Sequence, residues 1–404
     1  MLAATPVHAS AAVGRGESLA QQIPCVVAPK WMQPIQALPV GSNQQPVPNV
    51  ALLGSRRAAF ARRGWRGRSA ADAPRAWMPL TLSCPNDPAM STSTTRHFLQ
   101  LPDLTPEEVR RVLELGRRIK AAPHEYAEAL KNRVLLMIFA KPSLRTRVSF
   151  EAGMAQMGGH AIYYDLGNSP LGAGKESIAD TARASTRMVD AVMARLFEHE
   201  EIEEFAAHSS VPVVNGLTNY THPCQILADL MTVAEKKGTL EGLTLCYTGD
   251  AQNNVTHSLL YGCAMLGVNI RVACPSGAEY EPLPKVVARA KEYAAKHGSE
   301  VTVSHDAKAA AQKADVIYTD SWMSYHIPKD EAQARRQLFL PYQVNAELMQ
   351  QAKPDAVFMN CLPAERGAEQ TAEVIDGPNS IVFDQAENRL HAQKGLLVFL
   401  LAGG

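Results

Sequence analysis

The stretch FAKPSLRTRVSFE, from Phe139 to Glu151, joins an apolar run to a segment that predicts a helix. Residues 134–140 (VLLMIFA) are continuously apolar, which is typical of a strand buried on both faces. Lys141 and Pro142 end this run, and residues 143–157 then have the pattern of a helix. The predicted core positions of this helix are Val148, Ala152, Ala155 and Met157.

The polar residues of this stretch fall in the first turn of the predicted helix, and they are Ser143, Arg145, Thr146 and Arg147. Unpaired backbone N–H groups and the positive end of the helix dipole lie at such a turn. Two arginines oppose that dipole unless an anion is bound, so the pattern predicts a site for a compact, multiply charged anion, with phosphate the best fit. The alternative is a capped helix with solvated arginines.

The bulk composition bounds the possible classes of protein. A chain of 404 residues with 46% hydrophobic and 20% charged residues is typical of a soluble globular protein of two domains. No apolar run reaches the roughly 20 residues that a membrane-spanning helix needs. The seven cysteines form no CxxC pair, which favours reduced thiols over a disulfide framework or a zinc site.

The first 93 residues differ from the rest of the chain. They hold nine Lys/Arg against three Asp/Glu, with a basic run at residues 56–68. This composition predicts an organelle transit peptide, and the alternative is a disordered basic arm. Met90 is a possible internal start, and we expect the fold to begin near Thr95. The remaining chain is net acidic, which argues against a nucleic-acid surface.

Strand and helix patterns alternate from residue 94 onward, and the pattern restarts at residues 236–238. Strands are expected at 134–140, 161–165, 191–197, 211–214, 243–249, 268–274, 301–306, 315–320 and 356–360. Helices are expected at 105–120, 143–157, 177–188, 223–236, 255–266, 283–297 and 385–401. The predicted fold class is α/β, with two domains that are each an open, mainly parallel sheet flanked by helices. The first domain spans 94–236 plus the C-terminal helix within 385–404, and the second spans 237–384.

Ligands of open parallel sheets bind beyond the carboxyl ends of the strands. Six polar sets follow predicted strands in this way: 143–146, Arg195, Asn215 with 221–225, 249–254, Asp320, and 360–363. We therefore expect these sets to line a common site.

Two of these sets begin helices. His222 and Gln225 of HPCQ are three residues apart and share a helix face, where they can donate to a carbonyl or bridging oxygen. A plain helix cap is the alternative. GDAQNN (249–254) lacks the glycines of a dinucleotide fingerprint. Asn253 and Asn254 begin a predicted helix and suit the α-amino and carboxylate groups of an amino acid, and the alternative role of Asn254 is an N-cap.

The remaining sets suggest an amine site and its walls. Asp320 and Ser324 of DSWMS offer a carboxylate for an ammonium group, or else a turn. Cys361 of NCLPAERG has no histidine predicted beside it, so covalent catalysis is not expected and Cys361 would be a polar wall. Arg389 lies in the opening turns of the last helix, where solvation is the alternative. No metal-spaced histidine cluster is present.

In order, the motifs SLRTR, MARLF, HPCQ, GDAQNN, DSWMS, NCLPAERG and ENRLHAQK resemble the aspartate/ornithine carbamoyltransferase family, and are most similar to its plant-type ornithine members. The resemblance covers residues 94–404. It implies two α/β domains, a homotrimer with sites near subunit interfaces, domain closure on binding, and no metal or organic cofactor. It also implies a plastid location, with the mitochondrion as the alternative.

The resemblance assigns roles to individual residues. It implies that carbamoyl phosphate is bound by Ser143, Leu144, Arg145, Thr146, Arg195, His222, Gln225, Cys361, Leu362 and Arg389. The ornithine-binding set in the second domain is Asn254, Asp320, Ser324 and Tyr325. The residues implied in catalysis are Arg145, His222, Cys361 and Arg389.

The expected activity is carbamoyl transfer from carbamoyl phosphate to L-ornithine, which gives citrulline for arginine biosynthesis. No nucleic acid or membrane partner is expected. Residues 324–326 (SYH) and Asn360 depart from the SMG and HCLP of the family, both on the amine side. The alternatives are therefore a carbamoyltransferase for another amine, such as putrescine, or a non-catalytic ligand-binding relative.

Overall fold

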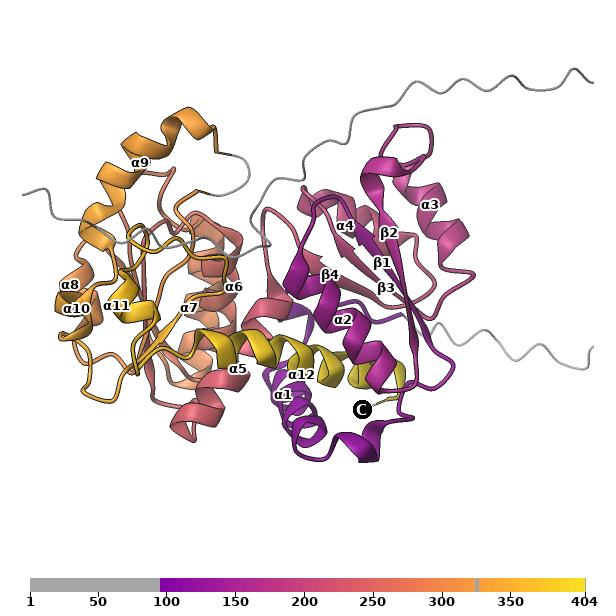
Figure 1. Cartoon of the computed structure of the whole chain (residues 1–404), viewed down its shortest axis with the longest axis horizontal. Helices are drawn as coiled ribbons and strands as arrows, with labels where there is room; N and C mark the ends of the chain where they lie inside the picture. The colour runs from indigo at the N-terminus through magenta and orange to yellow at the C-terminus, as the bar shows by residue number, and fades with distance from the viewer. Residues whose placement is uncertain (1–94, 324–326, 404) are drawn as a thin grey trace, which may run out of the picture. The chain divides into compact units, whose positions relative to one another are not determined.

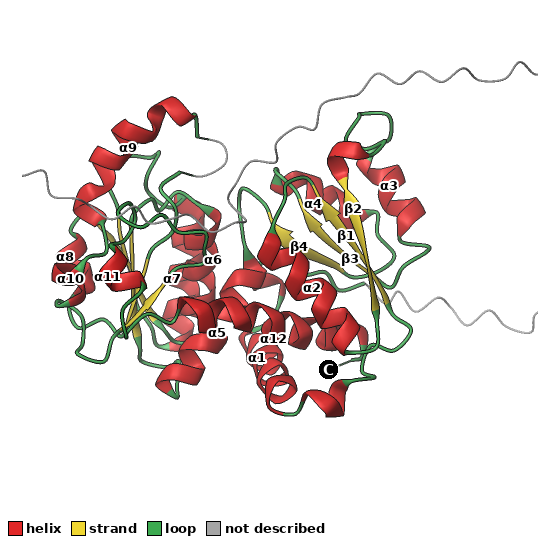
Figure 2. Cartoon of the chain, viewed as in Figure 1, coloured by secondary structure: helices red, strands yellow, loops and turns green. Residues whose placement is uncertain are grey.

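The structure is a computed structural model, which describes residues 95–323 and 327–403. These residues form two parallel β-sheets with helices around them (Figures 1 and 2). The predicted transit segment 1–93 and the predicted ornithine-binding residues Ser324 and Tyr325 lie outside these described residues. Within the described ranges, no helix is both long and apolar enough to cross a membrane. The two sheets confirm the predicted α/β fold class.

The first sheet has four strands in the order β2-β1-β3-β4, all parallel. The strands are β1 (Val134–Phe139), β2 (His160–Asp165), β3 (Ala191–Arg195) and β4 (Val213–Leu217). Between them run α2 (Leu144–Gln156), α3 (Ile178–Ser185) and α4 (His199–Ala207). The inner strands β1 and β3 are buried, as their apolar runs predict, whereas β2 at one edge is largely exposed.

The second sheet has five parallel strands in the order β7-β6-β5-β8-β9. They are β5 (Thr244–Thr248), β6 (Asn269–Ala273), β7 (Val301–Ser304), β8 (Val316–Tyr318) and β9 (Val357–Met359). The helices are α6 (Asn254–Met265), α7 (Pro284–His297), α8 (Ala307–Ala311), α9 (Ala332–Phe339), α10 (Ala346–Met349) and α11 (Ala372–Ile375). Every predicted strand is present. The shorter helices α4, α8, α9, α10 and α11 were not predicted, because few turns leave little periodicity to detect.

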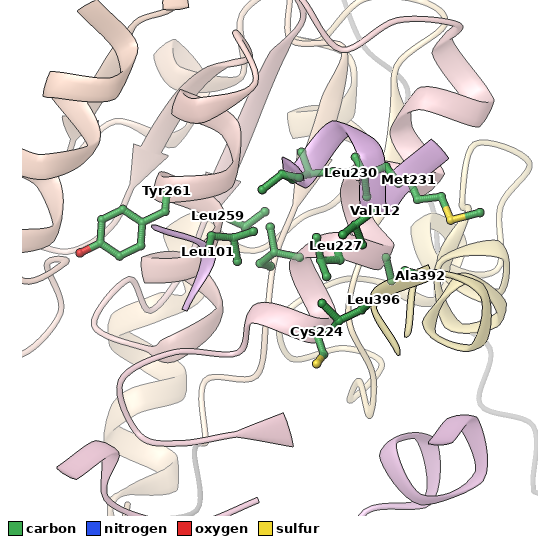
Figure 3. Packing of buried hydrophobic residues seen from close by; sticks show 14 of the residues in the cluster. Leu101, Val112, Cys224, Leu227, Leu230, Met231, Leu259, Tyr261, Ala392 and Leu396 are labelled. Carbon is green, nitrogen blue, oxygen red and sulfur yellow. The ribbon is translucent and has the colours of Figure 1, made fainter. Parts of the chain in front are cut away.

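Three helices build the core beside the first sheet: α1 (Pro106–Ala121), α5 (Pro223–Lys237) and α12 (Val382–Leu401). The C-terminal helix α12 packs against α1, α2 and α5. Figure 3 shows Val112, Leu227 and Leu396 from these three helices in the same buried cluster. The end of the chain therefore returns to the first sheet, and this return carries Arg389 to the start of α2.

Local signals in the sequence set the helix starts. Thr105 caps α1 in the predicted capping box: it accepts from the Glu108 N–H at 3.2 Å, and its own N–H donates to Glu108 Oε2 at 2.9 Å. Ser143 caps α2 by accepting from the Thr146 N–H at 3.4 Å. Both helices thus begin where capping residues satisfy otherwise unpaired N–H groups.

The predicted buried face of α2 was wrong at Val148 and Ala155. Val148 is 52% exposed and Ala155 is also exposed, whereas Ala152 is half-buried and Met157 is buried. The buried residues are Thr146, Ser149, Phe150, Gly153 and Met154. They recur at three- and four-residue spacing on the opposite face, because α2 also packs against α12 and not only on the sheet.

The close approach of α1 and α12 depends on two facing glycines. A Cβ added at Gly395 would lie 2.5 Å from the Val112 carbonyl oxygen and 2.7 Å from the Gly116 nitrogen. Gly153 on α2 differs, because a Cβ there would meet only side-chain atoms, the nearest of them Lys394 Cγ at 3.5 Å. Gly395 and Gly153 are therefore a suitable pair for comparison, because an added methyl group would meet backbone atoms at Gly395 and only side-chain atoms at Gly153.

We expect Gly395→Ala to destabilise the protein by about 1–3 kcal/mol, because backbone atoms must move apart. Gly153→Ala should stabilise it by about 0.5–1 kcal/mol, as alanine does in a helix with room for its methyl group. Urea unfolding of both variants measures this difference. A Gly395→Ala variant as stable as the native chain would show that α1 and α12 do not approach as closely as described.

Candidate active site

Hydrogen bonds connect polar segments that lie far apart in the sequence. Arg145 Nη2 donates to the Leu362 carbonyl oxygen at 2.5 Å, which joins the start of α2 to the loop after β9. Arg389 Nη2 donates to Thr146 Oγ1 at 3.2 Å, which joins α12 to the same turn of α2. The predicted sets after β1 and β9 and the predicted Arg389 are therefore brought together.

The first turn of α2 holds the core of the predicted anion site. Thr146 is buried, and its hydroxyl accepts from the Ser143 hydroxyl at 3.1 Å. The Leu144 side chain is exposed, so its backbone N–H is the group that it can offer to a ligand. This turn combines helix N–H groups, two hydroxyls and a guanidinium, which is suited to phosphate.

Arg147 does not belong to this anion site, although the sequence placed it in the same turn. Its guanidinium pairs with Glu151 at 3.0 Å and lies 4.0 Å from the centre of the Tyr163 ring. Successive residues of a helix point about 100° apart, so Arg145 and Arg147, which are two residues apart, lie on nearly opposite sides of α2 and cannot bind the same ligand. The predicted first-turn set is corrected to Ser143, Arg145 and Thr146.

His222 is buried at the start of α5, where its N–H donates to Ser258 Oγ at 2.8 Å. Burial lowers the pKa of its imidazole well below the usual range, and the positive charges of four side chains lower it further: Arg389, Arg195, Arg145 and Lys141. The ring is therefore neutral, and its Nδ1 has no hydrogen-bond partner among residues 95–323 and 327–403. A neutral imidazole here can bond to an uncharged polar group of a ligand.

Lys141 is a site residue that sequence reasoning treated only as the end of a strand. Burial, together with the nearby Arg195 at the end of β3, lowers the pKa of its amine to about 8. Its Nζ lies 4.6 Å from the centre of the Phe197 ring. The sequence could have predicted that Lys141 lies at the site, since it comes two residues before the cap of α2, at the carboxyl end of β1.

Gln225 and Arg389 form a buried pair, in which Arg389 Nη1 donates to Gln225 Oε1 at 2.7 Å. The amide nitrogen of Gln225 donates to Asp229 Oδ1 at 2.8 Å. Asp229 was not predicted, although it follows Gln225 by four residues and so shares its helix face. The alternatives that Gln225 is a cap and that Arg389 is solvated are wrong.

Asp320 and Cys361 meet on the side of the second sheet. The Cys361 thiol donates to Asp320 Oδ1 at 3.0 Å. Burial raises the pKa of the Asp320 carboxyl, and burial together with the Asp320 charge raises the pKa of the Cys361 thiol well above its usual value. Cys361 is thus held as a neutral thiol rather than as the nucleophilic thiolate, and Asp320 is placed to receive a cationic amine.

Asn254 is the first residue of α6 rather than its cap. Asn253 is the cap and accepts from the Thr256 N–H at 2.8 Å. The Asn254 amide donates instead to the Thr218 carbonyl oxygen, in the loop after β4, at 2.6 Å. The alternative of a plain N-cap is therefore wrong for Asn254, which connects the loops after β4 and β5.

Arg335 of α9 holds together two loops on the side of the site where the amine is expected to bind, and no pattern in the sequence predicted this role. Its guanidinium forms a buried ion pair with Asp250 at 2.5 Å and donates from Nε to the Trp322 carbonyl oxygen at 2.9 Å. Asp250 follows β5 and Trp322 follows β8. One side chain thus fixes the loop that begins α6 relative to the loop that carries Asp320.

The described residues contain no group of three His, Cys, Asp or Glu side chains arranged to hold a metal ion. What they do contain is an anion site with cationic side chains, a neutral imidazole beside it, and a carboxylate across from it. Such a set can bind a phosphate ester and an amine together and stabilise negative charge that forms between them.

Comparison with known proteins agrees with this chemistry. The family model for the aspartate/ornithine carbamoyltransferase carbamoyl-P binding domain matches residues 96–235, and the model for the Asp/Orn binding domain matches residues 241–400. The two matches divide the chain close to the point where the predicted strand pattern restarts.

Relatives that match about three quarters of the chain point the same way. The ornithine carbamoyltransferase of Pyrococcus abyssi is 50% identical over 313 residues, which is 76% of this chain and 96% of the relative. The anabolic ornithine carbamoyltransferase of Pyrococcus furiosus is 49% identical over 313 residues, 76% of this chain and 97% of the relative. The solved structure of the P. furiosus ornithine carbamoyltransferase has a TM-score of 0.73 and 49% identity, and covers 76% of this chain and 98% of its own. The chain belongs to the aspartate/ornithine carbamoyltransferase family.

Proposed function

We propose that this protein transfers the carbamoyl group of carbamoyl phosphate to the δ-amine of L-ornithine and releases citrulline and phosphate. The observation that carries the proposal is the anion site at the start of α2, joined by Arg145 to the loop that holds Cys361 against Asp320. The relatives named ornithine carbamoyltransferase support the same acceptor. The name of the anabolic P. furiosus enzyme supports a role in arginine biosynthesis.

In the proposed reaction, the neutral δ-amine attacks the carbamoyl carbon. A C–N bond forms, the bond from that carbon to the bridging oxygen breaks, and the departing phosphate takes the proton that the amine loses. Negative charge grows first on the carbonyl oxygen and then on the phosphate. Arg145, Arg389 and the neutral His222 would donate to these oxygens, and one such donor contributes about 3 kcal/mol to the transition state.

The polar residues of the amine side favour an amino acid over a simple diamine. Putrescine has neither an α-amine nor an α-carboxylate, and it would not need Asp320 with its thiol partner or the Asn254 amide. A non-catalytic relative would not need a complete set of donors around the carbamoyl group. Ornithine thus accounts for more of the described side chains than either alternative.

The direct test supplies purified protein with carbamoyl phosphate and either ornithine or putrescine. We expect citrulline from ornithine and little carbamoylputrescine, because only ornithine can bond to Asp320 and Asn254 through its α-groups. A preference for putrescine, or no product from either amine, would contradict the proposal.

Two variants separate the halves of the site. We expect Arg145→Ala to raise the KM for carbamoyl phosphate about 10- to 100-fold, the loss expected for a charged hydrogen bond. Asp320→Ala should chiefly raise the KM for ornithine. Steady-state kinetics with each substrate varied in turn measures both effects.

Arg117→Ala is the control for this pair, because Arg117 is exposed on α1 and pairs only with Glu114 of the same helix among the described ion pairs. It should leave both KM values unchanged. An Asp320→Ala variant that loses carbamoyl phosphate and keeps ornithine would show that the two halves are assigned the wrong way round.

We also propose that the protein is a homotrimer, as the family resemblance implies. Its support is an exposed apolar patch on α2 and the α2-facing side of β2, formed by Leu144, Val148 and Tyr163, which are 75%, 52% and 36% exposed. The strand β2 lies at an edge of its sheet, so this patch is available to another copy of the chain.

Val148→Glu should dissociate the assembly, because it places a charge in the middle of the apolar patch. Leu340→Glu is the control, since Leu340 is 56% exposed outside the patch. Sedimentation analysis should give three chains per particle for the native protein and the control, and fewer for Val148→Glu. A native monomer would contradict the trimer.

A further inference from the structure

Asp229 is a buried carboxylate to which the proposed reaction assigns no task. It lies on α5, and three donors converge on its two oxygens. Gln225 Nε2 and Gln385 Nε2 each donate to Oδ1 at 2.8 Å. The Tyr318 hydroxyl of β8 donates to Oδ2 at 2.9 Å. This one side chain therefore connects α5, α12 and the second sheet.

One branch of this network leads to the anion site. The Gln225 amide donates to Asp229 through its nitrogen, which leaves its oxygen facing Arg389 Nη1 at 2.7 Å. Arg389 in turn donates to Thr146 at the start of α2. The orientation of the Gln225 amide, and with it the position of the Arg389 guanidinium, thus depends on an acceptor at Asp229.

The other branch leads to the loop after β9. Gln385 donates to Asp229 through its nitrogen, and its oxygen accepts from the Asn360 N–H at 3.1 Å. The Asn360 side-chain oxygen accepts from the Leu362 N–H at 2.8 Å. This loop also receives Arg145 at the Leu362 carbonyl oxygen. The same carboxylate therefore holds both walls between which the carbamoyl group would lie.

We infer that Asp229 is a positioning residue for carbamoyl phosphate, which sets Gln225 and Arg389 on one side of the carbamoyl group and residues 360–362 on the other. The inference rests on the proposed function, because it assigns the carbamoyl group to the space between these two walls.

Only an acceptor fits at this position. Both glutamine nitrogens and the tyrosine hydroxyl donate, and an ionised carboxylate accepts at both oxygens. An asparagine can keep its oxygen at the Oδ1 position, to which both glutamines donate, whereas a leucine of similar shape removes the acceptor of both amides. A buried donor without an acceptor costs about 1–3 kcal/mol, and rotation of the Gln225 amide would then place its N–H₂ against the Arg389 cation.

The charge of Asp229 is costly to the fold. Burial raises the pKa of its carboxyl from the usual 3.8 to about 6, against the opposing effects of its hydrogen bonds and of Arg389. The titratable groups that face it are Arg389 of α12, Cys263 of α6, Tyr318 of β8 and Cys361 after β9. Burial raises the pKa of the two thiols and of the phenol, so all three are neutral near pH 7.

Because its pKa is raised on folding, Asp229 makes the free energy of unfolding depend on pH. The folded state binds the proton of Asp229 more tightly than the unfolded chain does, so the stabilising contribution is complete below about pH 4 and declines as the pH rises to about 6. The ionised form at neutral pH therefore reduces stability. A buried charge that lowers stability is more readily explained by a functional task than by a structural one.

The test uses Asp229→Leu and Gln385→Met in the full chain. We expect Asp229→Leu to raise the KM for carbamoyl phosphate about tenfold or more and to leave the KM for ornithine within about twofold. Gln385→Met should also raise the KM for carbamoyl phosphate, but by a smaller factor. Calorimetry with phosphonoacetamide, in which CH₂ replaces the bridging oxygen of carbamoyl phosphate, should show a matching loss of affinity.

Thr232→Val is the matched control. Thr232 lies on α5 one turn after Asp229 and accepts from the Asn388 amide of α12 at 2.9 Å, so it joins the same two helices outside the Asp229 network. It should lower the melting temperature without changing either KM.

An Asp229→Leu variant that behaves like this control, with phosphonoacetamide affinity unchanged, would overturn the inference. If Asp229→Leu does not fold, an unchanged KM for carbamoyl phosphate in Gln385→Met would overturn it. Failure of the proposed function is distinguishable, because the native enzyme would then form no citrulline.

Discussion

Positive charge gathered around a buried imidazole is the constraint on which the site depends. Arg145, Arg195, Arg389 and Lys141 all act on His222, and together with burial they keep it neutral. Mutual repulsion among desolvated cations is unfavourable unless an anion is bound between them. The start of α2 adds helix N–H groups and two hydroxyls at the same place. A dianionic acyl phosphate such as carbamoyl phosphate would relieve this repulsion, which explains why cationic groups from different segments meet there.

The two sheets supply different chemistry because they end in different groups. The first sheet ends in cations and hydroxyls, and the second ends in a carboxylate paired with a thiol. Hydrogen bonds cross from one to the other: Arg145 donates to the Leu362 carbonyl oxygen, and the Tyr318 hydroxyl donates to Asp229. The carbamoyl donor and the amine would thus be held by separate elements, whose relative position these bonds and a shared hydrophobic core fix. Proximity of this kind supplies a large part of the rate of a two-substrate reaction.

Sequence reasoning found the strands and most of the polar residues that the structure brings together, because apolar runs and polar strand ends are local signals. It failed where the answer depends on packing. The buried face of α2 was assigned wrongly at Val148, since the position of α12 cannot be read from α2 alone. Arg335 was missed because its partners Asp250 and Trp322 come from two other loops. Asp229 could have been found, since it lies one helical turn after Gln225.

The proposed reaction requires that a phosphate dianion binds at the start of α2 and faces an amine held by Asp320. A crystal structure of the protein with phosphonoacetamide bound would show this arrangement directly. We expect the phosphonate oxygens within hydrogen-bonding distance of Ser143, Arg145 and Arg195, with the amide beside His222 and Gln225. A phosphonate bound elsewhere, with the first turn of α2 left without ligand, would rule out this binding mode.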